Sequence, residues 1–173
     1  MLRQFYTYLV IGGLLLMPHL SKAQYARLET DRNVYGSIFL TDLGWGTKFG
    51  LNAPVRNSPF VVGGELYGEW GRPFQVSSSS YGGTFNVGVA PFFLGYNFNF
   101  LIKAGLTGVY DILNGLPESH RGFGYGLRGG AEAQYYITRD VALGVFGNQS
   151  YLFKGYLGKK RYDYGISLLF NIH

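Results

Sequence analysis

Apolar and polar residues alternate with period two through most of the chain after its first thirty residues. In segment 162–172 the even positions are large and apolar or aromatic, while the odd positions include Asp163 and Ser167. Segments 98–112 and 123–137 follow the same pattern. This period is typical of β-strands with one apolar face, and no stretch beyond residue 23 has the 3.6-residue period of an amphipathic helix. The pattern predicts an all-β fold.

The two faces of these predicted strands differ in a way that favours lipid on the outside. The apolar face is rich in aromatic residues, whereas the polar face is largely Gly with isolated charges. Strands of about ten residues with apolar side chains outward and polar side chains inward are typical of outer-membrane barrels. A soluble barrel would carry many Lys, Glu and Thr on its outer face. An exported lipocalin-like binding protein is the alternative interpretation.

The alternation predicts eight strands. They span residues 33–41, 44–53, 59–70, 83–95, 99–113, 122–137, 141–152 and 162–172. The longer connections lie at 71–82, 114–121 and 153–161, and on that side only the first loop, around 41–43, is short. Outer-membrane barrels combine short periplasmic turns with longer external loops. We therefore expect an eight-stranded antiparallel up-and-down transmembrane β-barrel in the outer membrane of a Gram-negative bacterium, with both chain ends in the periplasm.

Residues 1–23 have the features of a cleaved signal peptide. An apolar run at residues 8–17 follows Arg3 and ends before Pro18. Ser21 and Ala23 then supply small residues at the positions that a signal peptidase reads. A membrane anchor is the alternative, but the run is shorter than the roughly 20 apolar residues that a spanning helix needs. The remaining chain, 24–173, is expected to form a single barrel domain.

Composition excludes several functional classes. The chain has no Cys, which excludes disulfide scaffolds, zinc fingers, thiol enzymes and lipoprotein anchors. An aromatic content of 18% with only 14% charged residues argues against disorder. Two of the three His lie in the predicted signal peptide and at the last position, so we expect no metal site and no cofactor. The formal net charge of +5 falls when the signal peptide is removed, and we expect no direct binding of nucleic acid.

Charged residues on the inward face are expected to pair inside the barrel. The predicted interior network consists of Lys48, Glu65, Lys103, Arg128 and Glu132. Closing the turn at 54–58 brings Lys48 opposite Glu65, and closing the loop at 114–121 brings Lys103 opposite Glu132 and Thr107 opposite Arg128. An eight-stranded barrel has room only for side chains, and buried charges need partners. We predict a plugged barrel; a proton or ion path is the alternative.

Aromatic residues are expected to form a girdle at each end of the lipid-facing band. The predicted strands place Trp45 and Trp70 at the outer rim, and Phe98, Phe100, Tyr135 and Phe170 near the inner rim. Pro91 falls within a predicted strand. Because proline has no N–H to donate to the ladder, we expect a β-bulge at this position.

Motifs for catalysis and for ligand binding are weak. The G-x-G-x-x-G sequence at 124–129 lies in a period-two strand with no helix after it, which argues against a nucleotide site. Ser119 and His120, beside Glu118, have the residue types of an acyl hydrolase, but we interpret them as part of a solvated external loop. The last predicted loop carries a basic cluster of Lys154, Lys159, Lys160 and Arg161. We interpret this external basic loop as contacting anionic headgroups, with a protein partner or DNA as the alternatives.

Several segments resemble small outer-membrane barrels of Bacteroidota. They are 95–98 with 104–108, 129–132 with 136–143, and the closing strand 164–172. Among these barrels the chain most resembles the TraO proteins of conjugative transposons, over roughly residues 34–172. The resemblance implies a signal-bearing outer-membrane protein that belongs to a mating apparatus and contacts other transfer proteins. It assigns a function to no individual residue.

We consider three functional hypotheses for the chain. The first is a non-enzymatic outer-membrane barrel that serves as a component of a conjugative DNA-transfer apparatus. The second is a general surface adhesion or membrane-stabilising barrel. The third is a lipid-modifying barrel enzyme that uses Ser119 and His120. In each case outer-membrane lipid is an expected partner.

Overall fold

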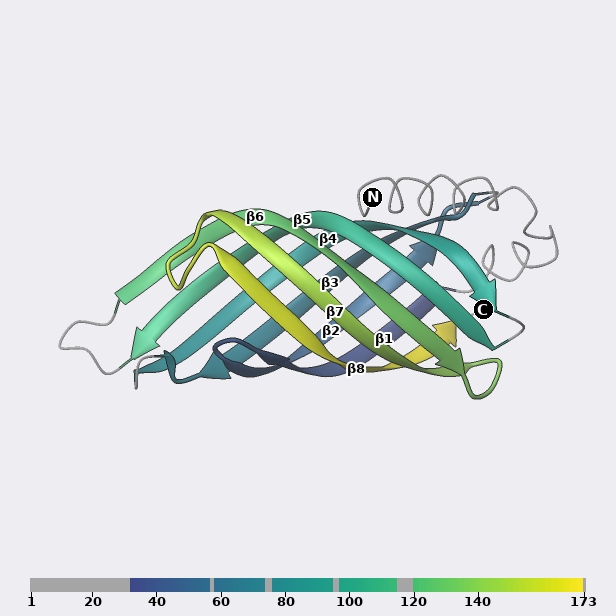
Figure 1. Ribbon diagram of the computed structural model, residues 1–173, viewed down its shortest axis with the longest axis horizontal. Helices are drawn as coiled ribbons and strands as arrows, with labels where there is room; N and C mark the ends of the chain where they lie inside the picture. The colour runs from purple at the N-terminus through teal and green to yellow at the C-terminus, as the bar shows by residue number, and fades with distance from the viewer. Residues whose placement is uncertain (1–31, 57, 74–75, 95–96, 115–119, 173) are drawn as a thin grey trace, which may run out of the picture.

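The chain forms one closed antiparallel β-barrel of eight strands (Figure 1). The computed structural model describes residues 32–56, 58–73, 76–94, 97–114 and 120–172. The strands are β1 (Arg32–Thr41), β2 (Gly44–Pro54), β3 (Phe60–Gly71), β4 (Ser77–Leu94), β5 (Phe98–Asn114), β6 (His120–Tyr136), β7 (Val141–Lys154) and β8 (Lys160–Ile172). Each strand pairs with the next in sequence, and β1 pairs with β8. The predicted fold class is therefore confirmed, while the predicted signal peptide lies outside the described residues.

Closure satisfies the backbone of every strand and leaves no sheet edge to pair with another chain. Within this cylinder the period-two pattern separates the two faces as expected. On β8, Asp163, Ser167 and Leu169 are buried inside, whereas Ile166 and Phe170 are exposed outside. No helix in the described part of the chain is long and apolar enough to cross a membrane.

The two ends of the barrel differ in what they carry. Arg32 pairs with Ile172, so both ends of the described chain lie at one end of the barrel, called here the terminal end (Figure 1). The opposite end, called the loop end, carries the connections at 42–43, 72–76, 115–119 and 155–159. Strands β4, β5 and β6 have 17 or 18 residues, compared with 10 to 12 in β1, β2 and β3. The wall they form extends farthest at the loop end.

The loops at this end are shorter than the sequence predicted. Strand β4 begins at Ser77 rather than at residue 83, because its serine run pairs with the upper parts of β3 and β5. The hydroxyl of Ser80 donates a buried hydrogen bond to Asp111 of β5. Four consecutive serines have no apolar alternation, so their strand pairing is not visible in the hydrophobic pattern.

Two irregularities interrupt the strand register. The β4–β5 pairing shifts between Val89 and Phe92, which confirms the β-bulge expected at Pro91. A second shift, which the sequence did not predict, lies between β6 and β7: Tyr125 pairs with Lys154, whereas Gly126 pairs with Leu152. The extra residue on β7 is therefore Phe153.

Glycines on the inward face make room for aromatic rings in the lumen. A Cβ atom at Gly50 would lie 2.5 Å from the ring of Tyr35, and one at Gly82 would collide with the ring of Tyr67. Tyr35 and Tyr67 thus occupy space that neighbouring strands leave open. Crowding by rings therefore explains glycine at these two inward positions.

Candidate functional site

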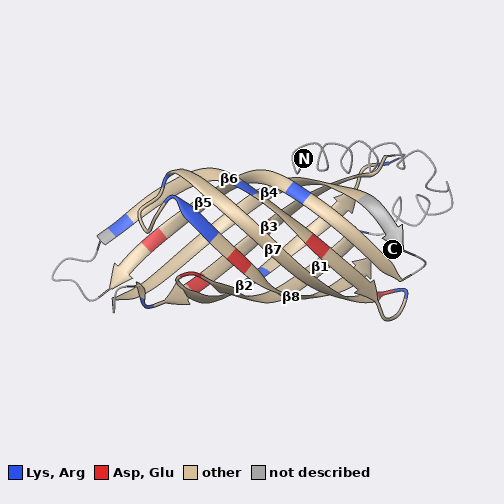
Figure 2. Cartoon of the chain, viewed as in Figure 1, with Lys and Arg blue, Asp and Glu red and all other residues tan. Residues whose placement is uncertain are grey.

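The centre of the lumen is closed by an ion-pair network around Arg128. Its Nε lies 3.1 Å from Glu65 Oε1, and its Nη2 lies 2.7 Å from Asp163 Oδ2. These three residues come from β6, β3 and β8, and all are buried. Figure 2 shows that Lys, Arg, Asp and Glu occupy few positions and that these are spread over several strands. The guanidinium is suited to this bridging position because its donors form a planar fork.

Further donors connect this central network to the remaining walls. Asp163 Oδ2 also accepts hydrogen bonds from Lys48 Nζ at 3.1 Å and from Asn148 Nδ2 at 2.8 Å. Glu65 accepts one from the hydroxyl of Tyr35 at 2.9 Å. The ammonium of Lys48 lies 3.6 Å from the centre of the Phe146 ring, in a cation–π contact. Six of the eight strands thereby contribute polar groups to one network.

A second ion pair lies nearer the terminal end. Lys103 Nζ and Glu132 Oε2 are 2.5 Å apart, and the other oxygen of Glu132 accepts a hydrogen bond from Ser167. Lys103 is directly opposite Gly130, not Glu132, so the pair forms diagonally across β5 and β6. The structure therefore brings these two residues together, although not by the register that the sequence predicted.

The predicted pairing of Lys48 with Glu65 is wrong. Lys48 lies opposite Tyr67, and Glu65 lies opposite Gly50, because the β2–β3 register differs by two residues from the one obtained by closing the turn at 54–58. The same difference in the β5–β6 hairpin places Thr107 opposite Gly126, and Arg128 opposite Gly105. The inward direction of these side chains is unaffected, because a shift of two residues preserves the face of a strand.

Arg161 does not belong to the external basic loop. It lies within β8 at an inward position, is only 7% exposed, and its Nη2 is 2.6 Å from Asp111 Oδ2. Asp111 also accepts the hydrogen bond from Ser80, so the carboxylate is satisfied near the loop end of the lumen. The sequence-based boundary ended the loop at Arg161, whereas β8 begins one residue earlier, at Lys160.

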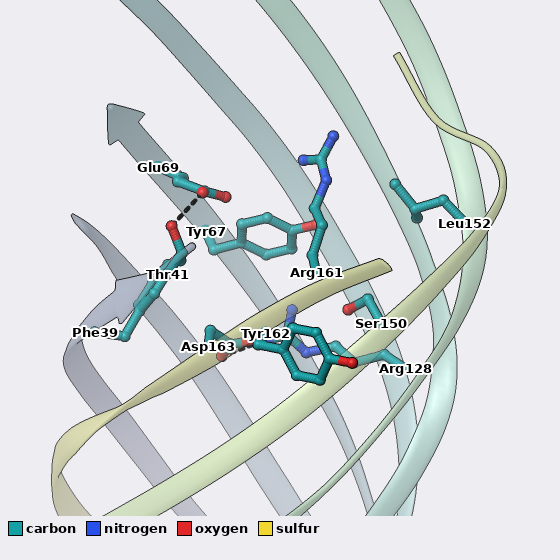
Figure 3. A pocket seen from close by; sticks show the side chains of 10 residues that line it. All are labelled: Phe39, Thr41, Tyr67, Glu69, Arg128, Ser150, Leu152, Arg161, Tyr162 and Asp163. Carbon is teal, nitrogen blue, oxygen red and sulfur yellow. Dashed lines mark hydrogen bonds and ion pairs between the residues drawn. The ribbon is translucent and has the colours of Figure 1, made fainter. Parts of the chain in front are cut away.

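A small hollow separates the Arg161 pair from the central network (Figure 3). It is about large enough for a single water molecule. Glu69 lies on its wall and accepts a hydrogen bond of 2.5 Å from the hydroxyl of Thr41. None of the ion pairs among the described residues includes Glu69. This hollow between the two groups of ion pairs is therefore small and lined by side chains.

Lys154, Lys159 and Lys160 are exposed at the loop end, as the prediction of an external basic loop requires. Arg121 is also exposed there, at a position of β6 whose side chain points outward. Arg121 falls in the loop predicted at 114–121, so its exposure on a strand face was not expected from the sequence. The exposed basic cluster thus consists of Arg121, Lys154, Lys159 and Lys160.

The residues of the predicted aromatic girdles occupy opposite ends of the barrel. At the loop end Trp45 and Trp70 are direct cross-strand partners, with ring centroids 5.2 Å apart, and Tyr81 lies edge-on to Trp70 at 6.3 Å. At the terminal end Phe98 pairs with Tyr135, Phe100 lies two residues farther along β5, and Phe170 lies opposite Val141 near the end of β8. Trp45, Tyr135 and Phe170 are exposed on the outer surface.

The described residues offer little for catalysis or metal binding. No group of three or more His, Cys, Asp or Glu that can hold a metal occurs among them. Ser119 and Glu118 lie outside the described residues, and the side chain of His120 is not described. The G-x-G-x-x-G sequence lies within β6, where its backbone is engaged in pairing with β5 and β7. That position leaves no helix N-terminus to receive a phosphate.

No protein-family model and no curated protein sequence matches the chain. Solved structures do match. A major outer membrane protein from Thermus thermophilus aligns with a TM-score of 0.70 at 9% identity, covering 82% of this chain and 99% of that one. Ail, the attachment invasion locus protein of Yersinia pestis, aligns with a TM-score of 0.62 at 11% identity, covering 83% and 99%.

The outer membrane enzyme PagL is also similar in fold, with a TM-score of 0.53 and 12% identity, covering 81% of this chain and 99% of that one. At such low identities the likeness extends to the fold and not to the site residues. The chain thus has the fold of the eight-stranded outer-membrane barrels.

Proposed function

We propose that this chain is a non-enzymatic outer-membrane barrel whose lumen is plugged and whose loop end faces the cell exterior. The observation that carries the proposal is the outer face. Large apolar side chains are exposed around the whole cylinder, including Phe49, Leu66, Phe85, Leu106 and Val145. Soluble monomers rarely expose a continuous apolar surface of this extent. In a bilayer the same surface is stably solvated by lipid tails.

Fractionation and topology mapping test this proposal. The full chain should sediment with outer membranes and migrate faster on gels when it is not heated, because a closed barrel stays compact in detergent. A tag inserted after Lys159 should be accessible on intact cells, and a tag after Ser58 should be protected. Exposure of the Ser58 tag together with protection of the Lys159 tag would invert the orientation.

We further propose that the barrel serves a conjugative DNA-transfer apparatus. The support is the sequence resemblance to TraO proteins, together with a plugged lumen, which suits a scaffold better than a conduit. Deletion of the gene in a conjugative element should reduce DNA transfer, and Ser119→Ala or His120→Ala variants should restore it fully. Unchanged transfer after deletion would instead favour the surface adhesion or membrane-stabilising role. The fold likeness to Ail, named as an attachment protein, supports that alternative.

A lipid-modifying enzyme is the remaining candidate. It is supported by the fold likeness to PagL, named as an outer membrane enzyme, and by the adjacent Ser119 and His120. Mass spectrometry of lipid A from a deletion strain separates the two classes. An altered acylation pattern that wild-type protein restores and His120→Ala does not restore would establish the enzyme and reject the non-enzymatic proposal.

A further inference from the structure

An aromatic cluster lies on the outer face of β6 and β7 near the loop end. Its members, Tyr125, Tyr151 and Phe153, are all exposed. The ring centroids of Tyr125 and Tyr151 each lie 6.0 Å from that of Phe153. Tyrosine at the boundary between hydrocarbon and water keeps its ring in the lipid and its hydroxyl among the headgroups. This cluster therefore marks the level of the headgroups on this wall.

The β-bulge in β7 places a lysine beside this cluster. Without the bulge, Lys154 would continue the series of inward positions that includes Ser150 and Leu152. Phe153 is the extra residue, and the register shift sets Lys154 directly opposite Tyr125. Residues directly opposite on antiparallel strands share a face. Lys154 is thereby turned to the outer surface, and re-aiming a side chain is a known effect of bulges.

Other exposed cations lie on the same strands or in the loop between β7 and β8. Lys160 lies directly opposite Tyr151 and belongs to the outward positions of β8. Lys159 precedes it, and its carbonyl accepts a hydrogen bond from the amide of Leu152, which fixes this part of the loop against β7. Arg121 is exposed on neighbouring β6.

The opposite wall provides an internal comparison. Trp45, Trp70 and Tyr81 form a similar aromatic cluster at the loop end of β2, β3 and β4. The exposed charged residues adjoining it in sequence are Asp42 and Arg72, which are of opposite sign. Among the residues that the structure describes, aromatic anchoring is thus present on both walls, whereas an excess of positive charge occurs only beside the cluster on β6 and β7.

We infer that Arg121, Lys154, Lys159 and Lys160, above the rings of Tyr125, Tyr151 and Phe153, form a binding site for the phosphorylated headgroup of a lipid in the external leaflet. The rings contact the upper acyl chains, and the ammonium groups contact the phosphates as point charges. This inference rests on the proposed function, because it requires a membrane-embedded barrel with its loop end outside. It adds the class of lipid and the wall that binds it.

Spin-labelled lipids test the site in the full chain. The barrel is reconstituted in phosphatidylcholine vesicles with trace spin-labelled lipid A, dephosphorylated lipid A or phosphatidylcholine. Electron paramagnetic resonance then gives the relative association of each lipid with the protein. At 50 mM salt we expect about a fivefold preference for lipid A over phosphatidylcholine, as for a net gain of about 1 kcal/mol from cations at the headgroup level. The barrel should not prefer dephosphorylated lipid A over phosphatidylcholine. In 0.5 M salt its preference for lipid A should disappear.

A matched pair of variants tests the location. The triple variant Lys154→Gln, Lys159→Gln, Lys160→Gln should lose most of the preference, and Lys160→Gln alone should lose part of it. The control Arg32→Gln, Arg56→Gln, Arg139→Gln removes the same charge from the terminal end and should retain the preference. Equal loss in both triple variants, full retention in the lysine variant, or equal binding of dephosphorylated lipid A would overturn this inference and leave the barrel proposal intact. Failure of the wild-type chain to form a heat-modifiable barrel in vesicles would overturn both.

Discussion

The inner and outer faces of this barrel follow opposite rules. Each charged group inside has particular partners: Asp163 accepts from three donors on three strands, and Arg128 binds two carboxylates. Outside, a residue such as Leu66 is 70% exposed and needs only to be apolar. The specific contacts of the inner face therefore favour one arrangement of the strands. The apolar outer face makes that arrangement stable in lipid.

Removing the central cation should have the largest effect on the inner face. Arg128→Ala leaves both Glu65 and Asp163 without their strongest partner inside the lumen. Breaking a buried pair in this way costs about 3–5 kcal/mol. Urea unfolding in vesicles, followed by tryptophan fluorescence, should show this loss. Arg139→Ala, in an exposed turn, should change the free energy of unfolding by less than about 0.5 kcal/mol.

A charge on the outer face should have the next largest effect. Leu66→Arg introduces a cation in the middle of β3 on the lipid side, and such substitutions cost about 2–4 kcal/mol near the bilayer midplane. Leu66→Ile keeps the apolar character and should be nearly neutral in the same titration. If Leu66→Arg were equally neutral, this face would be in contact with water and the contrast between the faces would fail.

The Lys103–Glu132 pair should show specific coupling. Replacing both residues by Gln should cost less than the sum of the two single replacements, with a coupling energy of about 0.5–3 kcal/mol for residues in contact. The reference is a cycle that replaces Glu132 and Arg161, because Arg161 binds Asp111 and not Glu132. In this cycle the two losses in free energy of unfolding should be close to additive. Additivity in both cycles would mean that Lys103 and Glu132 do not interact in solution.

The smallest effect is expected at the aromatic rim. Trp45→Leu removes a ring that contacts Trp70 in a tilted arrangement but keeps an apolar side chain, so the loss should be about 1 kcal/mol. Trp45→Phe retains a ring and should lose less. Equal losses in the two variants would show that lipid contact, rather than the ring pair, stabilises this rim.

The period-two pattern was sufficient to predict the fold and the direction of most side chains. The predicted inward and outward directions of side chains agree with the structure on β5, β6 and β8, because alternate residues of a strand lie on opposite faces. The pairing of particular residues was less predictable. Register depends on how tightly each turn closes, and a difference of two residues gave Lys48 the wrong partner while leaving it inside the lumen.

Contacts that cross the barrel could not be predicted from neighbouring hairpins. Asp163 and Asp111 are not among the predicted network residues, although Asp163 belongs to the polar positions of its segment and the same alternation places Asp111 on the polar side of segment 98–112. Asp163 meets Lys48 only because β8 closes against β1, and Asp111 meets Arg161 across the lumen. Arg161 was also assigned to a loop, because charged residues at a strand end resemble loop composition.

The position of Asp163 has a consequence for assembly. This acceptor lies on the last strand, 115 residues from Lys48 and 35 from Arg128. The two cations therefore lack its carboxylate until β8 is in place, and we expect the contact with Lys48 of β2 to form when the seam between β1 and β8 closes. Such long-range contacts form late and slowly. Opening must break the seam and expose the charges together, so we expect the closed barrel to persist mainly because its unfolding rate is low.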